Sequence, residues 1–308
     1  MPPEMRPDPR RAHLSAGVLR RLEWSLRRPL ANRLGGDQRS VQRGAGIELT
    51  EVREYQPGDD VRQIDWNITA RTDRPHVRES FVERALDVWL LIDLSASVDW
   101  GTARMLKRDQ AADFAAVASA LLTGRGNRVG VVTFADRIGR VIPPGAGRPH
   151  LLHLTAAVDA APGQMGRAPT DLTGALDHAG RMVRRRSLLI VVSDFLAPSG
   201  WQRPLRRLAH RHEVVAVRIA DPREGELPDV GLLTVEDPET GRQLLVDTGD
   251  RRLRERFRSE AQVQAAALES EIRAAGAELL TLSTDDDLMP ALVRFLGTRR
   301  IRRGVPHR

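Results

Sequence analysis

Residues Asp87 to Ser97 read Asp-Val-Trp-Leu-Leu-Ile-Asp-Leu-Ser-Ala-Ser, and this stretch decides the fold. The apolar run Val88–Ile92 is too short to span a membrane and predicts a strand buried on both faces, as in a parallel sheet. Asp93, Ser95 and Ser97 follow the run at alternate positions. Ligands of open α/β sheets bind where the strands end. One carboxylate and two hydroxyls at that place would suit Mg²⁺ or a similar hard cation.

A simpler interpretation of this loop stays open, in which Asp93 only caps the next helix and the serines only complete a turn. Two later residues bear on the choice. Thr170 begins a predicted helix, and Asp194 follows the apolar strand Ser187–Val192. We expect both at the same edge of the sheet as Asp93, although each has its own simpler interpretation, as a helix cap and as a turn residue.

The remaining chain alternates between strand and helix patterns, which predicts an α/β fold with a doubly wound, mostly parallel sheet and helices on both faces. An N-terminal helix at 14–28 and a β-rich annex are expected before it. The predicted strands are Ile47–Tyr55, His76–Val82, Val88–Ile92, Arg128–Phe134, Ile138–Ile142, Ser187–Val192, Glu213–Ile219, a hairpin in Leu232–Val246, and Glu278–Leu282. The main predicted helices are Val61–Trp66, Lys107–Leu122, Pro149–Ala161, Asp171–Arg184, Trp201–His210, Arg251–Ala275 and Asp286–Gly297.

These patterns divide the chain into four parts. They are a disordered tail (1–12), an N-terminal helix with the annex (13–86), the α/β domain (87–298) and a basic tail (299–308). No cysteine is present, which excludes disulfides and thiolate metal sites and agrees with a reducing compartment. No apolar run approaches the roughly 20 residues of a membrane span, and the N-terminus lacks the apolar core of a signal peptide. We therefore expect a cytoplasmic protein without a transmembrane segment.

The net charge of +7 is concentrated at the two ends of the chain. Residues 1–45 carry +6 and residues 299–308 carry +5, which leaves −4 for the body. Of the 48 basic residues, 47 are arginine, and Lys107 is the only lysine. Binding of nucleic acid or an anionic surface through the arginine-rich ends is therefore the alternative function. The slightly acidic body weakens the case for nucleic acid, and attraction of the basic helix at 14–28 to anionic lipid headgroups is the lesser option.

The set of Asp93-x-Ser95-x-Ser97, Thr170 and Asp194 resembles the metal-ion-dependent adhesion site of von Willebrand factor A domains. In that family the hydroxyls ligate a divalent cation, the aspartates hold it directly or through water, and a partner's Asp or Glu fills the vacant position. The resemblance covers roughly residues 86–298 and implies Mg²⁺, with Mn²⁺ or Ca²⁺ as alternatives. One departure is Phe195, where many such domains have glycine.

A second resemblance lies in the segment Gly46-x-Glu48-Leu49-x-Glu51-x-Arg53-x-Tyr55-x-Pro57-Gly58-Asp59-Asp60-x-Arg62-x-Ile64-Asp65-Trp66-x-x-x-Ala70-Arg71. It is similar to the signature of the bacterial family called domain of unknown function 58. In that family the segment precedes a von Willebrand A-like core, and many members carry two membrane helices that this sequence lacks. The family is typically encoded beside MoxR-type AAA+ ATPases, so the resemblance implies such an ATPase as a partner.

The signature segment has two interpretations that do not exclude each other. In the first, it is an annex packed beside the metal site, with Arg62 and Arg71 paired to nearby carboxylates and with Tyr55 and Trp66 buried against the sheet. In the second, it is a docking surface for a protein partner. The residues of that surface would be Tyr55, Asp59, Asp60, Arg62, Asp65, Trp66 and Arg71.

No catalytic constellation is found in the sequence. A phosphotransferase of the haloacid dehalogenase type would carry a second Asp where this chain has Ser95, so the general acid is missing. The P-loop, His-Glu-x-x-His and Gly-x-Ser-x-Gly motifs are absent as well. The expected function is a non-enzymatic, divalent-cation-dependent adaptor that works with a MoxR-type AAA+ ATPase in the assembly or maturation of protein complexes.

Overall fold

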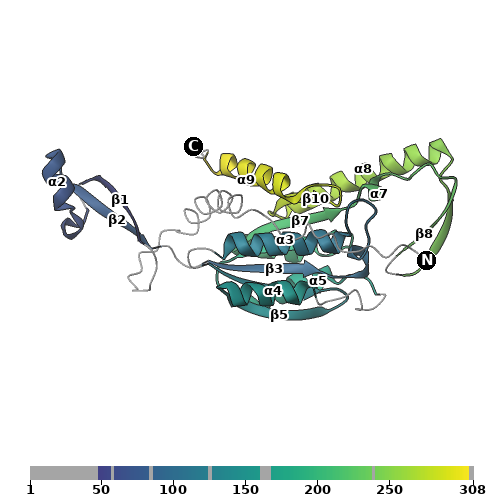
Figure 1. Cartoon of the computed structure of the whole chain (residues 1–308), viewed down its shortest axis with the longest axis horizontal. Coiled ribbons are helices and arrows are strands. Elements are labelled where there is room, and N and C mark those ends of the chain that lie inside the picture. The colour runs from purple at the N-terminus through teal and green to yellow at the C-terminus, as the bar shows by residue number, and fades with distance from the viewer. Residues whose placement is uncertain are drawn as a thin grey trace.

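A six-stranded β-sheet forms the centre of the chain in a computed structural model (Figure 1). The structure describes residues 48–56, 59–82, 86–123, 127–159, 168–237 and 240–304, so the predicted tail 1–12 and helix 14–28 lie outside the described residues. The strands of the sheet are β3 (Asp87–Asp93), β4 (Arg128–Phe134), β5 (Ile138–Gly145), β6 (Leu188–Ser193), β7 (Glu213–Ala220) and β10 (Glu278–Ser283). Their order is β10-β7-β6-β3-β4-β5, and every neighbouring pair is parallel except β4 with β5.

The central strands β3, β4 and β6 are buried on both faces of the sheet because nearly all of their side chains are apolar. In β3, Val88, Leu90 and Ile92 belong to one core cluster, whereas Trp89 and Leu91 alternate into the other. All residues of β6 are buried. The predicted two-sided burial of these strands is therefore confirmed.

Helices of the described residues cover both faces of the sheet, as predicted for a doubly wound fold. The core cluster of one face includes side chains of α3, α4 and α9, and that of the other face includes side chains of α5, α6 and α8. These helices are α3 (Lys107–Leu122), α4 (Arg148–Asp159), α5 (Leu172–Met182), α6 (Gln202–Arg211), α8 (Arg251–Ala274) and α9 (Leu288–Gly304).

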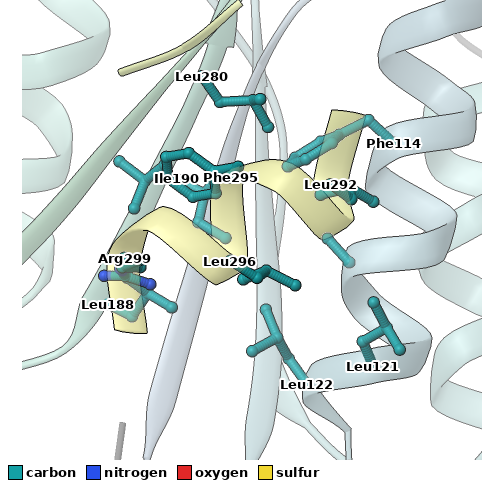
Figure 2. Close-up of a pocket in the computed structure, with 12 residues that line it drawn as sticks. Phe114, Leu121, Leu122, Leu188, Ile190, Leu280, Leu292, Phe295, Leu296 and Arg299 are labelled. Carbon is teal, nitrogen blue, oxygen red and sulfur yellow. The ribbon is translucent and has the colours of Figure 1, made fainter. Parts of the chain in front are cut away.

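The last helix, α9, continues to Gly304 instead of ending at Gly297 as predicted. Leu292, Phe295 and Leu296 close an apolar cavity of about 40 Å³ against α3 and the sheet (Figure 2). Arg299, assigned from sequence to the basic tail, lines the same cavity and is buried. Its guanidinium is ion-paired with Glu213 and, at 2.7 Å, with Glu278. Part of the C-terminal basic charge is thus directed into the fold, which explains why the helix extends further.

The signature segment forms a small unit of its own. Strands β1 (Glu48–Glu54) and β2 (His76–Val82) pair antiparallel, with the 3₁₀ helix η2 (Val61–Gln63) and helix α2 (Trp66–Thr72) between them. A single helix over Val61–Trp66 was predicted. The chain forms two short helices instead, because the side chain of Asp65 accepts hydrogen bonds from the backbone N–H groups of Asn67 and Ile68 and so starts a new helix.

This unit does not lie beside the predicted metal site. Strand β2 leads into the amino end of β3, whereas the predicted site follows the carboxyl end, and Figure 1 shows β1, β2 and α2 at one end of the molecule. Trp66 is 69% exposed and Tyr55 is half-buried. The prediction that the annex packs beside the metal site with Trp66 buried against the sheet is therefore wrong. Helix α2 buries none of its residues, so it is not packed against the domain.

An insertion between β7 and α8 extends from the carboxyl edge of the sheet. It consists of α7 (Pro222–Gly225) and the predicted hairpin, which forms as β8 (Leu232–Glu236) and β9 (Gln243–Asp247). The 3₁₀ helix η3 (Ala96–Val98) follows β3 at the same edge.

Candidate metal-ion site at the carboxyl edge of the sheet

The carboxyl ends of β3 and β6 lie side by side in the middle of the sheet, with Ile92 paired to Val192. From β3 the chain crosses to β4 on one side, and from β6 it crosses to β7 on the other side. The place between them is a topological switch point, where open α/β sheets bind their ligands. Asp93 ends β3, and Asp194 directly follows β6. The structure therefore brings both predicted aspartates to this point.

Asp93 is completely buried and is held on both of its carboxylate oxygens. Oδ1 accepts a hydrogen bond from the backbone N–H of Ser95 at 3.0 Å, and Oδ2 accepts one from the Ser193 hydroxyl at 2.6 Å. Burial raises the pKa of Asp93 to about 7, and the nearby Asp194 carboxylate adds to this, although the bonds from Ser193 and Ser95 act in the opposite direction. A carboxylate in this state gains from any cation placed beside it.

The two serine hydroxyls of the first loop lie together, with Ser95 Oγ and Ser97 Oγ 3.1 Å apart. Ser95 is buried and precedes helix η3, yet its side chain makes no capping bond to that helix. The simpler interpretation of the loop is thus only partly right. Asp93 does shape the turn through the N–H of Ser95, while the serine hydroxyls are directed toward each other rather than toward the helix end.

The loop after β6, which contains Asp194, includes a strained residue. This residue is Phe195, where the chain departs from the pattern of von Willebrand factor A domains. Phe195 has φ of 59°, in the left-handed region that favours glycine. Its ring is buried and packs edge-to-face on Trp201, with the ring centroids 5.6 Å apart. Its N–H donates to the Ser193 hydroxyl at 3.0 Å. Aromatic packing offsets the backbone strain, so the loop keeps its shape without glycine.

Replacing Phe195 by Ala should lower the free energy of unfolding by about 3–4 kcal/mol, because the ring is lost while the left-handed backbone stays. Phe195→Gly should cost about 1 kcal/mol less, because glycine adopts this conformation without strain. Urea unfolding of the two variants measures the difference. An Ala variant as stable as the Gly variant would contradict the assignment of strain to this residue.

Thr170 lies at the same edge of the sheet and is buried. The N–H of the next residue, Asp171, donates to the carbonyl of Ala135 just beyond β4, which places this loop at the carboxyl ends of the strands. The simpler interpretation made Thr170 the cap of the following helix. The side chain of Asp171 takes that role instead, accepting from the N–H of Gly174 at 2.8 Å. Capping therefore does not account for Thr170.

Lys107, a residue that sequence reasoning did not place in the site, reaches it from the first turn of α3. Its ammonium donates to Asp194 Oδ2 at 2.8 Å and to Glu224 Oε1 at 2.7 Å, and it lies 5.7 Å from the ring centroid of Trp100. Burial alone would lower the pKa of Lys107, but the carboxylates of Asp194 and Glu224 raise it above its ordinary value. The lysine is therefore a fixed positive charge.

Another buried carboxylate, that of Asp221, ties together the loops around the site. It accepts hydrogen bonds from the Thr102 hydroxyl at 2.6 Å, from the Thr284 hydroxyl at 2.6 Å and from the backbone N–H of Arg223 at 2.9 Å. Burial alone would raise the pKa of Asp221, but these donors and the N–H of Thr102 hold it below its ordinary value. Asp221 is a structural anion that holds neighbouring loops in place.

The donor set of this edge fits a hard divalent cation. It combines the buried Asp93 carboxylate, two serine hydroxyls in contact and the buried Thr170. Within the described part of the chain, no group of three or more His, Cys, Asp or Glu side chains is arranged to hold a metal. A metal site here would thus depend on hydroxyl ligands. Asp194 fits less directly, since Oδ1 accepts from the N–H of Leu196 at 3.0 Å and Oδ2 is held by Lys107.

The residues of the predicted docking surface gather elsewhere, in the unit of β1, η2, α2 and β2. Asp60 and Asp65 cap the two short helices, and Asp65 is buried. Arg62, Trp66 and Arg71 are exposed. An ion pair of this unit joins Arg74 to Glu54 at 3.0 Å. A role in docking stays a prediction for these residues, and the partner carboxylates proposed for Arg62 and Arg71 stay predictions as well.

Two of the residues missed by sequence reasoning had a local signal. Lys107 is the only lysine among 48 basic residues, and Ser193 stands between an apolar strand and Asp194. Glu224 had no local signal in the sequence, because it lies 117 residues from the lysine that it contacts.

Comparison with known proteins agrees with this architecture. A family model described as "Protein of unknown function DUF58" matches residues 51–267. An uncharacterized protein of Mycobacterium tuberculosis strain H37Rv is 42% identical over 287 residues, which cover 92% of this chain and 90% of that protein. Among the described residues, no helix is both long and apolar enough to cross a membrane.

One solved structure resembles the fold at low sequence identity, and a second superposes less closely. The conserved hypothetical protein BatB from Bacteroides thetaiotaomicron superposes with a TM-score of 0.50 and 13% identity, covering 71% of this chain and 100% of that chain. The SpRpn10 VWA domain superposes with a TM-score of 0.41 and 14% identity, covering 73% of this chain and 100% of that domain.

Proposed function

The chain belongs to the family described as protein of unknown function DUF58 and has a von Willebrand factor A-like fold, and from this premise we propose that it is a protein-interaction module whose binding depends on a divalent cation. The observation that carries the proposal is the meeting of Asp93, Ser95 and Ser97 with the loops of Thr170 and Asp194 at the switch point of the sheet. The proposed cation is Mg²⁺, and the module itself is not an enzyme.

The proposed binding chemistry follows from the charges of the donors. Asp93 and the hydroxyls of Ser95, Ser97 and Thr170 would hold the cation, and hydroxyls bring no negative charge to it. A cation held mainly by neutral groups keeps a strong attraction for anions. The partner would therefore contribute an Asp or Glu carboxylate, which completes the coordination. A MoxR-type AAA+ ATPase, or a protein on which it acts, is the partner class that we propose to test.

Asp93→Ala should abolish binding of Mn²⁺ to the purified protein, measured by calorimetric titration or by the electron spin resonance of free Mn²⁺. The matched control is Asp285→Ala, since Asp285 follows the edge strand β10 at the same carboxyl edge of the sheet but is exposed. The control should bind Mn²⁺ as the wild type does. Equal binding by the wild type and Asp93→Ala would overturn the site.

The same proteins test the partner. Immobilised wild type should retain the MoxR-type ATPase in Mg²⁺ and release it in EDTA, whereas Asp93→Ala should not retain it under either condition. Retention by all proteins in both buffers would show that binding does not use the cation. The exposed residues Arg62, Trp66 and Arg71 would then be the next to be replaced.

A further inference from the structure

Lys107 is an exception in this chain, both in composition and in position. The other 47 basic residues are arginine, and the only lysine is almost fully buried at the candidate metal site, with 2% of its side chain exposed. An ammonium is a compact point charge, whereas a guanidinium is a wide planar fork. The one position at which the chain uses lysine instead of arginine is thus a position where carboxylates enclose a small cationic group.

The contacts of Lys107 are those of a bound cation. Its ammonium lies 2.8 Å from Asp194 Oδ2 and 2.7 Å from Glu224 Oε1, against the face of Trp100. Asp194 belongs to the loop after β6, and Glu224 belongs to α7. The lysine therefore occupies one of the two carboxylates that a divalent cation would use, and it neutralises that carboxylate from within the protein.

We propose that the Lys107 ammonium competes with the divalent cation for Asp194 and thereby keeps the metal affinity of the free protein low. This inference rests on the proposed function and adds a regulatory role for a residue outside the ligand set. With Lys107 in place, Asp93 is the one carboxylate of the ligand set that is not already paired with a cation. The incoming metal meets both a shared ligand and a nearby positive charge. A partner's carboxylate then becomes the contribution that makes cation binding tight.

Glu224 should act in the opposite direction to Lys107. It balances the ammonium from the side of α7, so that Lys107 is shared between two carboxylates. Without the charge of Glu224, the ammonium would be held by Asp194 alone and would repel a divalent cation more strongly. Two substitutions in contact with each other are thus expected to shift metal affinity with opposite signs.

The test is the affinity for Mn²⁺ of the full-length wild type, Lys107→Met, Glu224→Gln and the double variant. Methionine is as long as the lysine stem and packs well on an aromatic ring, so Trp100 keeps a neighbour. Lys107→Met should bind Mn²⁺ about tenfold or more tightly than wild type, and Glu224→Gln about threefold or more weakly, because a charge near the metal is removed in each case. The double variant should bind more tightly than wild type. Circular dichroism establishes that each variant is folded.

The outcomes separate this inference from the proposed function. If the wild type binds Mn²⁺ and a folded Lys107→Met binds it no more tightly, the inference is overturned, but the proposed metal site is still supported. Weaker binding by both single variants would also overturn it, since that result indicates general damage to the site. If Lys107→Met does not fold, a Glu224→Gln variant with unchanged or higher affinity overturns the inference by itself. Absence of Mn²⁺ binding in every protein would overturn both proposals.

Discussion

In a chelating buffer, the free energy of unfolding should fall as the pH rises from 5 to 8, and Asp93→Asn should remove most of this fall. The ordinary pKa of Asp93 is 3.8, whereas burial and Asp194 raise it to about 7 in the folded protein. Between these values the unfolded chain has released the proton and the folded protein still holds it. Stability from this group is therefore complete below pH 3.8 and is lost as the pH rises through 7.

The expected size of the effect is roughly 2–3 kcal/mol between pH 5 and pH 8, from integration over the two pKa values. Urea unfolding at several pH values measures it, with the difference between wild type and Asp93→Asn isolating this carboxyl from all others. Asp221→Asn is the matched control. Asp221 is also buried at this edge, but its pKa is lowered, so its contribution is lost only as the pH falls through its folded pKa, below 3.8.

Adding Mg²⁺ should reverse the trend for wild type, because a cation beside Asp93 favours the ionised carboxylate. The Asn variant should show no such response. A wild type whose stability follows that of Asp93→Asn at every pH would mean that Asp93 is ionised in the folded protein without any cation, and the physical basis for metal binding would be weakened.

Lys107→Met should lower the free energy of unfolding by about 3–5 kcal/mol in the same chelating buffer, since it leaves Asp194 and Glu224 without their cation. Asp194 is 2% exposed on its side chain and Glu224 is 18% exposed, so water compensates little for the loss at Asp194. The double variant Lys107→Met/Glu224→Gln should recover part of the loss, because one of the two unpaired charges is removed.

Mg²⁺ should restore more stability to Lys107→Met than to wild type, because the cation would replace the ammonium beside Asp194. The control is Arg251→Met, which breaks an exposed pair with Glu255 and should cost less than about 1 kcal/mol. If Lys107→Met is as stable as this control, the ammonium does not balance the charges of Asp194 and Glu224. The proposed competition between Lys107 and the metal for Asp194 would then lose its basis.

The strands and the first loop were predictable because they follow from neighbours along the chain. Val88–Ile92 is apolar at every position, so it requires burial on both faces, and Asp93 must then stand where the strand ends. The predicted helix Lys107–Leu122 was confirmed with both of its ends. Aspartate and serine at alternate positions need only a turn to come together, and Asp93 forms that turn with the N–H of Ser95.

The short helices of the signature segment were harder to predict because capping decides them. Val61–Trp66 has the composition of one helix, but Asp65 satisfies two backbone N–H groups and divides it in two. The exposure of Trp66 follows from the position of the whole unit at the amino end of β3. The aromatic side chain of Trp66 by itself favoured burial. Only the path of the chain shows that the six-stranded sheet is not beside this residue.

By itself, the sequence determined the alternating strands and helices, the oxygen ligands at the strand ends and the family signature, since each depends on residues within a few positions of one another. The tertiary structure alone decided the charge balance of the site. Lys107 meets Asp194 and Glu224 across 87 and 117 residues, and Ser193 meets Asp93 across 100. Such contacts arise only when the strand order places β3 next to β6 and α7 follows the adjacent strand β7, because burial then forces each charged group to find an opposite charge or a hydrogen bond.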